Sequence, residues 1–150
     1  MRLAMVFSLS FLVACSDPND PGDPLPLTPQ SLEGRWVKTQ VVRSTTTGPA
    51  VADTTEIPEN GEIYEFTESG GVEYSCRCPG FDVAPTPQCT SYSITGDTLW
   101  LRQEEGAPQP RLAEVTTRRL IFRGLGTMPV DISGDGVPED VRIDNIYRRE

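Results

Sequence analysis

The stretch SYSITGDTLWL, residues 91–101, decides the fold class of this 150-residue chain. Its apolar residues alternate with others: Tyr92 and Ile94 come before a Gly96-Asp97 pair, and two leucines follow it. Side chains on a β-strand alternate between two faces, so this pattern predicts two strands that each bury one face. Glycine followed by aspartate suits the two-residue turn of a tight hairpin. The stretch therefore predicts an antiparallel hairpin.

Further stretches of strand-like sequence lie on both sides of this hairpin. They are residues 35–42, 62–67, 71–78, 111–117, 119–125 and 140–149. No window shows the apolar period of about 3.6 residues that an amphipathic helix needs. About eight short strands joined by tight turns predict an all-β domain, which is either an up-and-down barrel or a β-sandwich.

Three motifs in these strands resemble those of lipocalins. Leu32-Glu33-Gly34-Arg35-Trp36 is similar to the G-x-W signature that opens the first lipocalin strand. Phe66 with residues 69–71, followed by the hairpin at 92–101, resembles the middle of bacterial lipocalin-like lipoproteins. Residues 145–150, NIYRRE, resemble their closing strand. The resemblance implies an eight-stranded antiparallel barrel, with Trp36 packed across its closed end. The β-sandwich stays the alternative.

The N-terminal segment predicts export and a lipid anchor. Arg2 precedes an apolar run, residues 3–14, that is too short to span a bilayer as a helix. This order is typical of a secretory signal. Leu12-Val13-Ala14-Cys15 resembles the bacterial lipobox, which implies cleavage before Cys15 and acylation of its thiol. The acid stands at Asp17 and not directly after the cysteine, so the resemblance favours the outer membrane of the cell envelope.

These features divide the chain into three predicted parts. Residues 1–14 are the lipoprotein signal peptide, and residues 15–31 are the lipidated cysteine with a Pro/Asp-rich tether. Proline disfavours both helices and sheet ladders, so the tether is expected to be extended. Residues 32–150 are the lipocalin-like barrel domain.

The charge balance excludes some partners and much catalytic chemistry. Of 13 basic residues, 12 remain after the signal is removed, against 22 acidic ones, which gives a formal charge of −10. Such a chain repels nucleic acid and anionic lipid headgroups. Its lack of histidine removes the commonest general base and metal ligand. With no Ser/His/Asp set and no phosphate-binding loop, the sequence predicts that the protein is not an enzyme.

Three cysteines in the domain predict one disulfide. An exported lipoprotein meets an oxidising compartment, where two of the cysteines are expected to pair. A Cys78–Cys89 bond would close the base of the proline-rich segment 79–88, a ring worth on the order of 3 kcal/mol. Cys76–Cys89 is the alternative pairing.

Residues 131–140, DISGDGVPED, resemble the front half of a calcium loop. Hard oxygen ligands at alternate positions before a glycine, here Gly136, are the pattern of such loops. The candidate ligands are Asp131, Ser133, Asp135, Glu139 and Asp140. Arg142 holds the twelfth position, where an EF-hand needs a bidentate glutamate, so the loop is not an EF-hand. A hairpin turn without a metal is the alternative, because Asp and Gly also favour turns.

Two functions fit these predictions. In the first, the barrel binds a small apolar ligand or a peptide, and an apolar probe is expected to quench tryptophan emission with saturation. The candidate ligand-binding residues are Trp36, Tyr64, Phe66, Tyr92 and Trp100. In the alternative, the protein is a non-enzymatic structural or interaction protein. Its barrel is then filled with side chains, and loops such as 79–88 contact an envelope partner.

Overall fold

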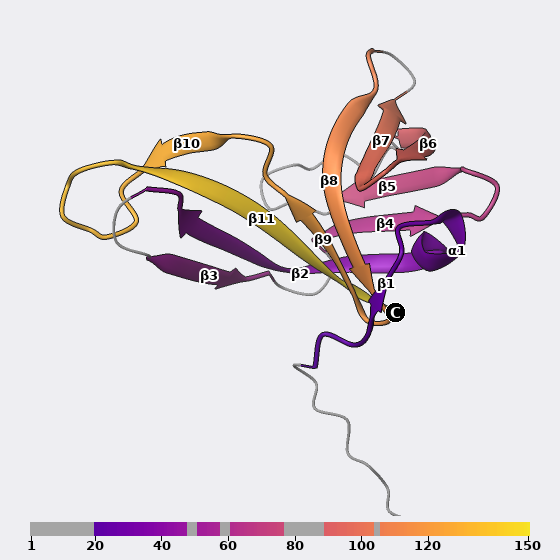
Figure 1. Ribbon diagram of the computed structural model, residues 1–150, viewed down its shortest axis with the longest axis horizontal. Coiled ribbons are helices and arrows are strands. Elements are labelled where there is room, and N and C mark those ends of the chain that lie inside the picture. Colours follow the sequence, from indigo (N-terminus) through magenta and orange to yellow (C-terminus); the bar gives the residue numbers. More distant parts are fainter. Residues whose placement is uncertain (1–19, 48–50, 58–60, 77–88, 104–105) are drawn as a thin grey trace, which may run out of the picture.

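The computed structural model describes residues 20–47, 51–57, 61–76, 89–103 and 106–150. This part of the chain is almost entirely β-structure, with one short helix, α1 (Pro29–Leu32) (Figure 1). Within those ranges, no helix has the length and apolar character needed to cross a membrane. The prediction of an all-β domain is confirmed.

Eight strands form a nearly closed antiparallel barrel. They are β2 (Gly34–Thr45), β4 (Glu62–Phe66), β5 (Val72–Cys76), β6 (Cys89–Thr95), β7 (Thr98–Gln103), β8 (Gln109–Thr116), β9 (Arg119–Arg123) and β11 (Glu139–Arg149). Neighbours in this series pair with each other, and β11 pairs back with β2. Between β5 and β6 the pairing narrows to one bridge, Gly71 to Ser91. This circular order is that of an up-and-down, lipocalin-like barrel and not of a sandwich.

The core of the barrel consists of side chains that the two-residue alternation points inward. The core residues are Leu32, Trp36, Tyr64, Phe66, Val72, Tyr92, Leu99, Leu101, Ala113, Val115, Leu120, Phe122 and Tyr147. The ring centroid of Tyr64 lies 4.8 to 5.7 Å from those of Phe66, Tyr74, Phe122 and Tyr147. Aromatic rings at such separations attract each other beyond the gain from burial alone.

Helix α1 packs at the end of the barrel where β2 begins. Thr28 and Ser31 form a reciprocal capping box, and Pro29 occupies the first turn, where its missing N–H costs nothing. The Trp36 indole Nε1 donates a hydrogen bond of 2.6 Å to the Leu32 carbonyl, and both residues are fully buried. Trp36 is therefore a structural core residue that ties this helix to the barrel.

The folded part begins earlier than Leu32, where the sequence placed its start. Strand β1 (Pro24–Leu25) pairs with the end of β8, and Leu25 and Leu27 pack against the core. Proline is tolerated in β1 because the strand lies at the edge of its ladder. Residues 24–31, predicted to be tether, are thus part of the domain.

β2 and β11 run past the barrel and carry two further strands, β3 (Ala52–Glu56) and β10 (Thr127–Val130). β3 pairs with residues 40–44 and β10 with residues 139–142, so these two are the outer strands. We call this four-stranded sheet the extension; it projects to one side of the barrel in Figure 1. Every residue of β3 is exposed. Neither outer strand has an alternating pattern, which is why the sequence did not predict them.

Candidate functional site

Four of the five predicted ligand-binding side chains belong to the packed core. Trp36, Tyr64, Phe66 and Tyr92 are 0%, 8%, 2% and 9% exposed. The fifth, Trp100, lies on the outer face of β7, because its neighbours Leu99 and Leu101 point inward. It is 37% exposed. The structure therefore brings four of these residues together as a core and leaves Trp100 outside it.

A polar triad of Lys38, Glu62 and Tyr147 lies beside the aromatic core. Lys38 Nζ is 2.9 Å from one Glu62 carboxylate oxygen, and the Tyr147 hydroxyl donates a 3.0 Å hydrogen bond to the other. Burial, followed by the nearby Tyr64 and Glu62, raises the pKa of Tyr147 well above its ordinary value of 10.0. The hydroxyl therefore stays protonated and acts as a donor. This triad was not predicted from the sequence, although Lys38 follows Trp36 by two residues and so shares its inward face.

A second polar network surrounds Asp144 on the outer face of the barrel. Its carboxylate accepts hydrogen bonds of 3.1 to 3.2 Å from Arg123, Arg142 and the Gly124 N–H. Arg123 also donates two hydrogen bonds of 2.7 Å to Glu114. This hydrogen bonding lowers the pKa of the Glu114 carboxyl. Because these groups satisfy each other, the network reads as a link between β8, β9 and β11 and not as a catalytic site.

The predicted calcium loop brings three carboxylates together. Oxygens of Asp131, Asp135 and Glu139 all lie within 4.8 Å of one another. The two Asp131 oxygens accept hydrogen bonds of 2.6 and 2.8 Å from the N–H groups of Gly134 and Gly136. These bonds hold a tight loop in which carboxylate oxygens, the ligands that Ca²⁺ prefers, are grouped.

The other two predicted ligands, Ser133 and Asp140, do not belong to this group of three carboxylates. The Ser133 hydroxyl bonds to Glu139, and this bond, with one from the Ile132 N–H, lowers the pKa of Glu139. Asp140 directly follows Glu139 in β11, so its side chain points to the opposite strand face. The structure therefore does not group Asp140 with the other three acids.

Calcium binding at this loop stays a prediction that thermal unfolding can test. A divalent cation would relieve the repulsion among three neighbouring carboxylates. Free Ca²⁺ at a hundred times its dissociation constant is expected to stabilise the protein by about 2.7 kcal/mol and to raise Tm accordingly. Asp131→Ala with Asp135→Ala should remove the rise, whereas Asp97→Ala, in another turn, should keep it. Equal Tm values in excess chelator and in millimolar Ca²⁺ would show that the loop is only a turn.

The predicted disulfide lies outside the described residues. Cys78 falls in the undescribed segment 77–88, and of Cys76 and Cys89 only the backbones, at the end of β5 and the start of β6, are described. Cys15 and the signal segment likewise fall outside the described ranges. Both the disulfide and the lipid anchor stay predictions.

Comparison of the chain with protein-family models, with curated proteins and with solved structures gives no match.

Proposed function

We propose that this protein is a lipid-anchored cell-envelope lipoprotein whose lipocalin-like barrel serves as a filled, non-enzymatic scaffold for interaction with an envelope partner. One observation carries the choice of a scaffold. The aromatic side chains that would line a ligand pocket pack against one another, with Tyr64 among four aromatic neighbours. An eight-stranded barrel is just wide enough to hold side chains or one small ligand. A small apolar ligand inside the barrel is therefore the weaker proposal.

The extension supports the interaction part of this proposal. Three of the four large apolar side chains that are exposed among the described residues lie in the segment 125–137: Leu125, Met128 and Val137. They are 54%, 48% and 62% exposed. The three belong to one stretch of the chain, which forms β10 and the connections on either side of it, and exposed apolar side chains there would be available to a partner. The outer strands β3 and β10 also offer backbone groups with which a partner strand can pair.

A non-enzymatic role is supported by the way the charged groups are used. The chain has no histidine. Among the described residues, the buried Asp144 and the half-buried Glu62 are engaged by basic side chains and by hydrogen bonds, whereas the half-buried Glu139 belongs to the acidic loop. Carboxylates that already have such partners contribute to the stability of the fold, which supports a structural role for them.

The anchor is tested at Cys15. The mature protein is expected to begin at Cys15, to carry a diacylglyceryl group by intact mass, and to fractionate with membranes, because two or more acyl chains give stable anchoring. Outer-membrane vesicles are the fraction in which we expect it. Cys15→Ala should release the chain or leave it unprocessed, whereas Cys76→Ala should leave its fractionation unchanged. A wild-type protein that is soluble and retains residues 1–14 would refute the anchor.

A further inference from the structure

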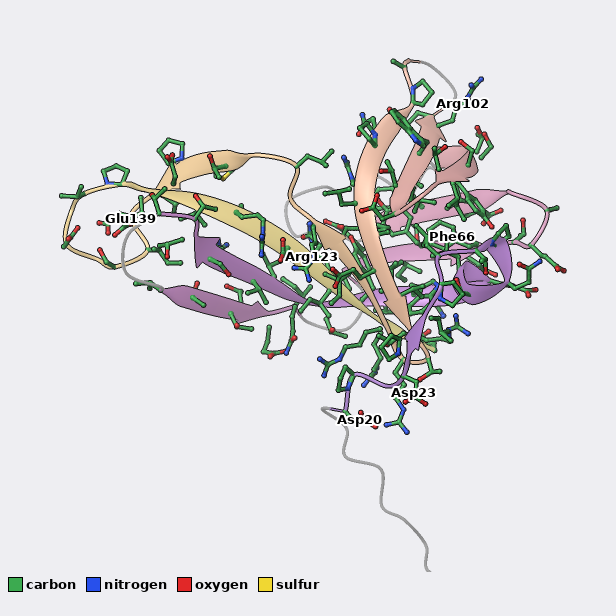
Figure 2. All side chains as sticks on the ribbon, in the orientation of Figure 1. Asp20, Asp23, Phe66, Arg102, Arg123 and Glu139 are labelled. Carbon is green, nitrogen blue, oxygen red and sulfur yellow. The ribbon has the colours of Figure 1, made fainter. Side chains whose placement is uncertain are left out.

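A cleft of about 650 Å³ lies at the end of the molecule where the described chain begins. Arg118, Arg119, Arg148, Arg149 and Asp20 are among the residues that line it. Figure 2 labels Asp20 at this end of the ribbon, and the C-terminus lies nearby in Figure 1. Four of the 13 basic residues of a strongly acidic chain thus surround one cleft.

The strand register places two of these arginines directly opposite each other. Arg119 of β9 and Arg148 of β11 are cross-strand partners, so their side chains leave the same face of the sheet. Like charges in this position destabilise a sheet. An anion bound on this face would lie within reach of both guanidinium groups, and arginine forms forked hydrogen bonds with phosphate oxygens.

The acidic residues of the cleft have partners of their own. Asp20 lies 3.4 Å from Arg118, and Glu150 lies 2.9 Å from Arg35. Glu56 accepts a 2.7 Å hydrogen bond from the Gln40 amide. Among the residues that line the cleft, four arginines stand against these three acids, a formal side-chain balance of +1.

Arg149 also lines the cleft, but its guanidinium is engaged by the end of the barrel. Its guanidinium carbon lies 4.5 Å above the Trp36 ring, and its Nη2 donates to the Ser31 carbonyl. Its Nε is the single buried side-chain nitrogen or oxygen without a hydrogen-bond partner among the described residues. This nitrogen is buried, and Arg149 leaves the strand face opposite to that of Arg148, so it is not placed to share an anion with Arg119 and Arg148.

The short stretch of chain between Cys15 and Asp20 favours an anion of the membrane surface as the ligand of the cleft. Asp20 comes five residues after Cys15, and five residues span at most about 18 Å. We propose that the cleft binds the phosphate of anionic phospholipid headgroups in the membrane that holds the Cys15 lipid, and so turns this end of the barrel toward the bilayer. This inference rests on the proposed anchor. The negative charge of the whole chain does not oppose it, because charges farther than about 8 to 10 Å away are screened at physiological salt.

Footprinting of arginine side chains on the anchored wild-type protein tests this proposal. The purified lipoprotein is placed in vesicles of phosphatidylcholine alone or with about one third phosphatidylglycerol, at about 0.1 M salt, where a Debye length of about 10 Å screens the distant acidic groups. Phenylglyoxal then labels accessible guanidinium groups, and mass spectrometry follows the labelling rate of each arginine. Arg102, at the opposite end of the molecule in Figure 2, is the control within the same chain.

Phosphatidylglycerol is expected to slow labelling of Arg119 and Arg148 about fivefold, the factor that matches the attraction of one arginine to an anionic membrane surface. The rate at Arg102 should not change, and half-molar salt should abolish the protection. Equal rates at all three arginines in both kinds of vesicle would overturn the proposal. Equal protection by inorganic phosphate on phosphatidylcholine vesicles would also overturn it, in favour of a soluble anion. Failure of the anchor itself would look different, because the protein would then float with neither kind of vesicle.

Discussion

Trp36→Ala is expected to lower the free energy of unfolding by roughly 3–5 kcal/mol, the usual cost of removing a large aromatic side chain from a core. Trp36 is fully buried, its indole N–H donates a hydrogen bond to the Leu32 carbonyl, and its ring stacks against the Arg149 guanidinium. The substitution removes all three interactions together. Since the whole stability of a domain is about 5–15 kcal/mol, this loss is a large part of it.

The matched control is Trp100→Ala, which removes the same side chain from the outer face of β7. Trp100 is 37% exposed, so the expected loss is below about 1.5 kcal/mol, less than half of the cost at Trp36. Urea unfolding followed by circular dichroism measures both losses without relying on tryptophan emission. Equal losses at the two positions would show that Trp36 does not have the structural role assigned to it.

Asp144→Asn is expected to cost about 2 kcal/mol. Removing the acid from a buried ion pair usually costs 3–5 kcal/mol, roughly, because it leaves the basic partner without a countercharge. The Asp144 side chain is only 10% exposed, but Arg123 and Arg142 are 34% and 40% exposed, and solvent reduces the effect. The Gly124 N–H can keep its bond to the new amide oxygen, so the loss reports mainly the two arginines.

Asp53→Asn provides the comparison for Asp144. Its pair with Arg43 has the same distance, 3.1 Å, but its side chain is 51% exposed, so we expect a loss of no more than about 0.5 kcal/mol. Chemical unfolding of the two variants under identical conditions gives both values. If Asp144→Asn costs no more than Asp53→Asn, the network joining β8, β9 and β11 is not the stabilising link described above.

The barrel strands could be predicted because each buries one face. Apolar residues therefore recur at every second position of these strands. The outer strands β3 and β10 bury little and exist because the long strands β2 and β11 offer them edges. A local pattern carries no signal for such strands. Helix α1 is only four residues long, too short for a periodic signal, although its Thr28-Pro29 start is a recognisable cap.

The candidate functional residues could be predicted only where a local sequence pattern, such as alternation or ligand spacing, determines their position. Alternation in residues 91–101 assigns Trp100 to the face opposite Leu99 and Leu101, so its place among the predicted ligand-binding residues of the barrel was wrong. In the acidic loop, spacing predicted the grouping of Asp131 and Asp135 with Glu139. The arginine cleft could not be predicted, because residues 118–119 and 148–149 meet only through the pairing of β9 with β11.

The central claim is that side chains fill the barrel, and a single-tryptophan titration tests it most directly. In Trp100→Phe, Trp36 is the remaining tryptophan of a chain that has two. The chain from Ser16 onward, which lacks the lipid and so needs no detergent, is titrated with a brominated fatty acid that quenches emission on contact. The packed interior predicts weak quenching that rises linearly without saturation. Saturable quenching of Trp36 at one fatty acid per protein would contradict the filled barrel and establish an interior ligand site.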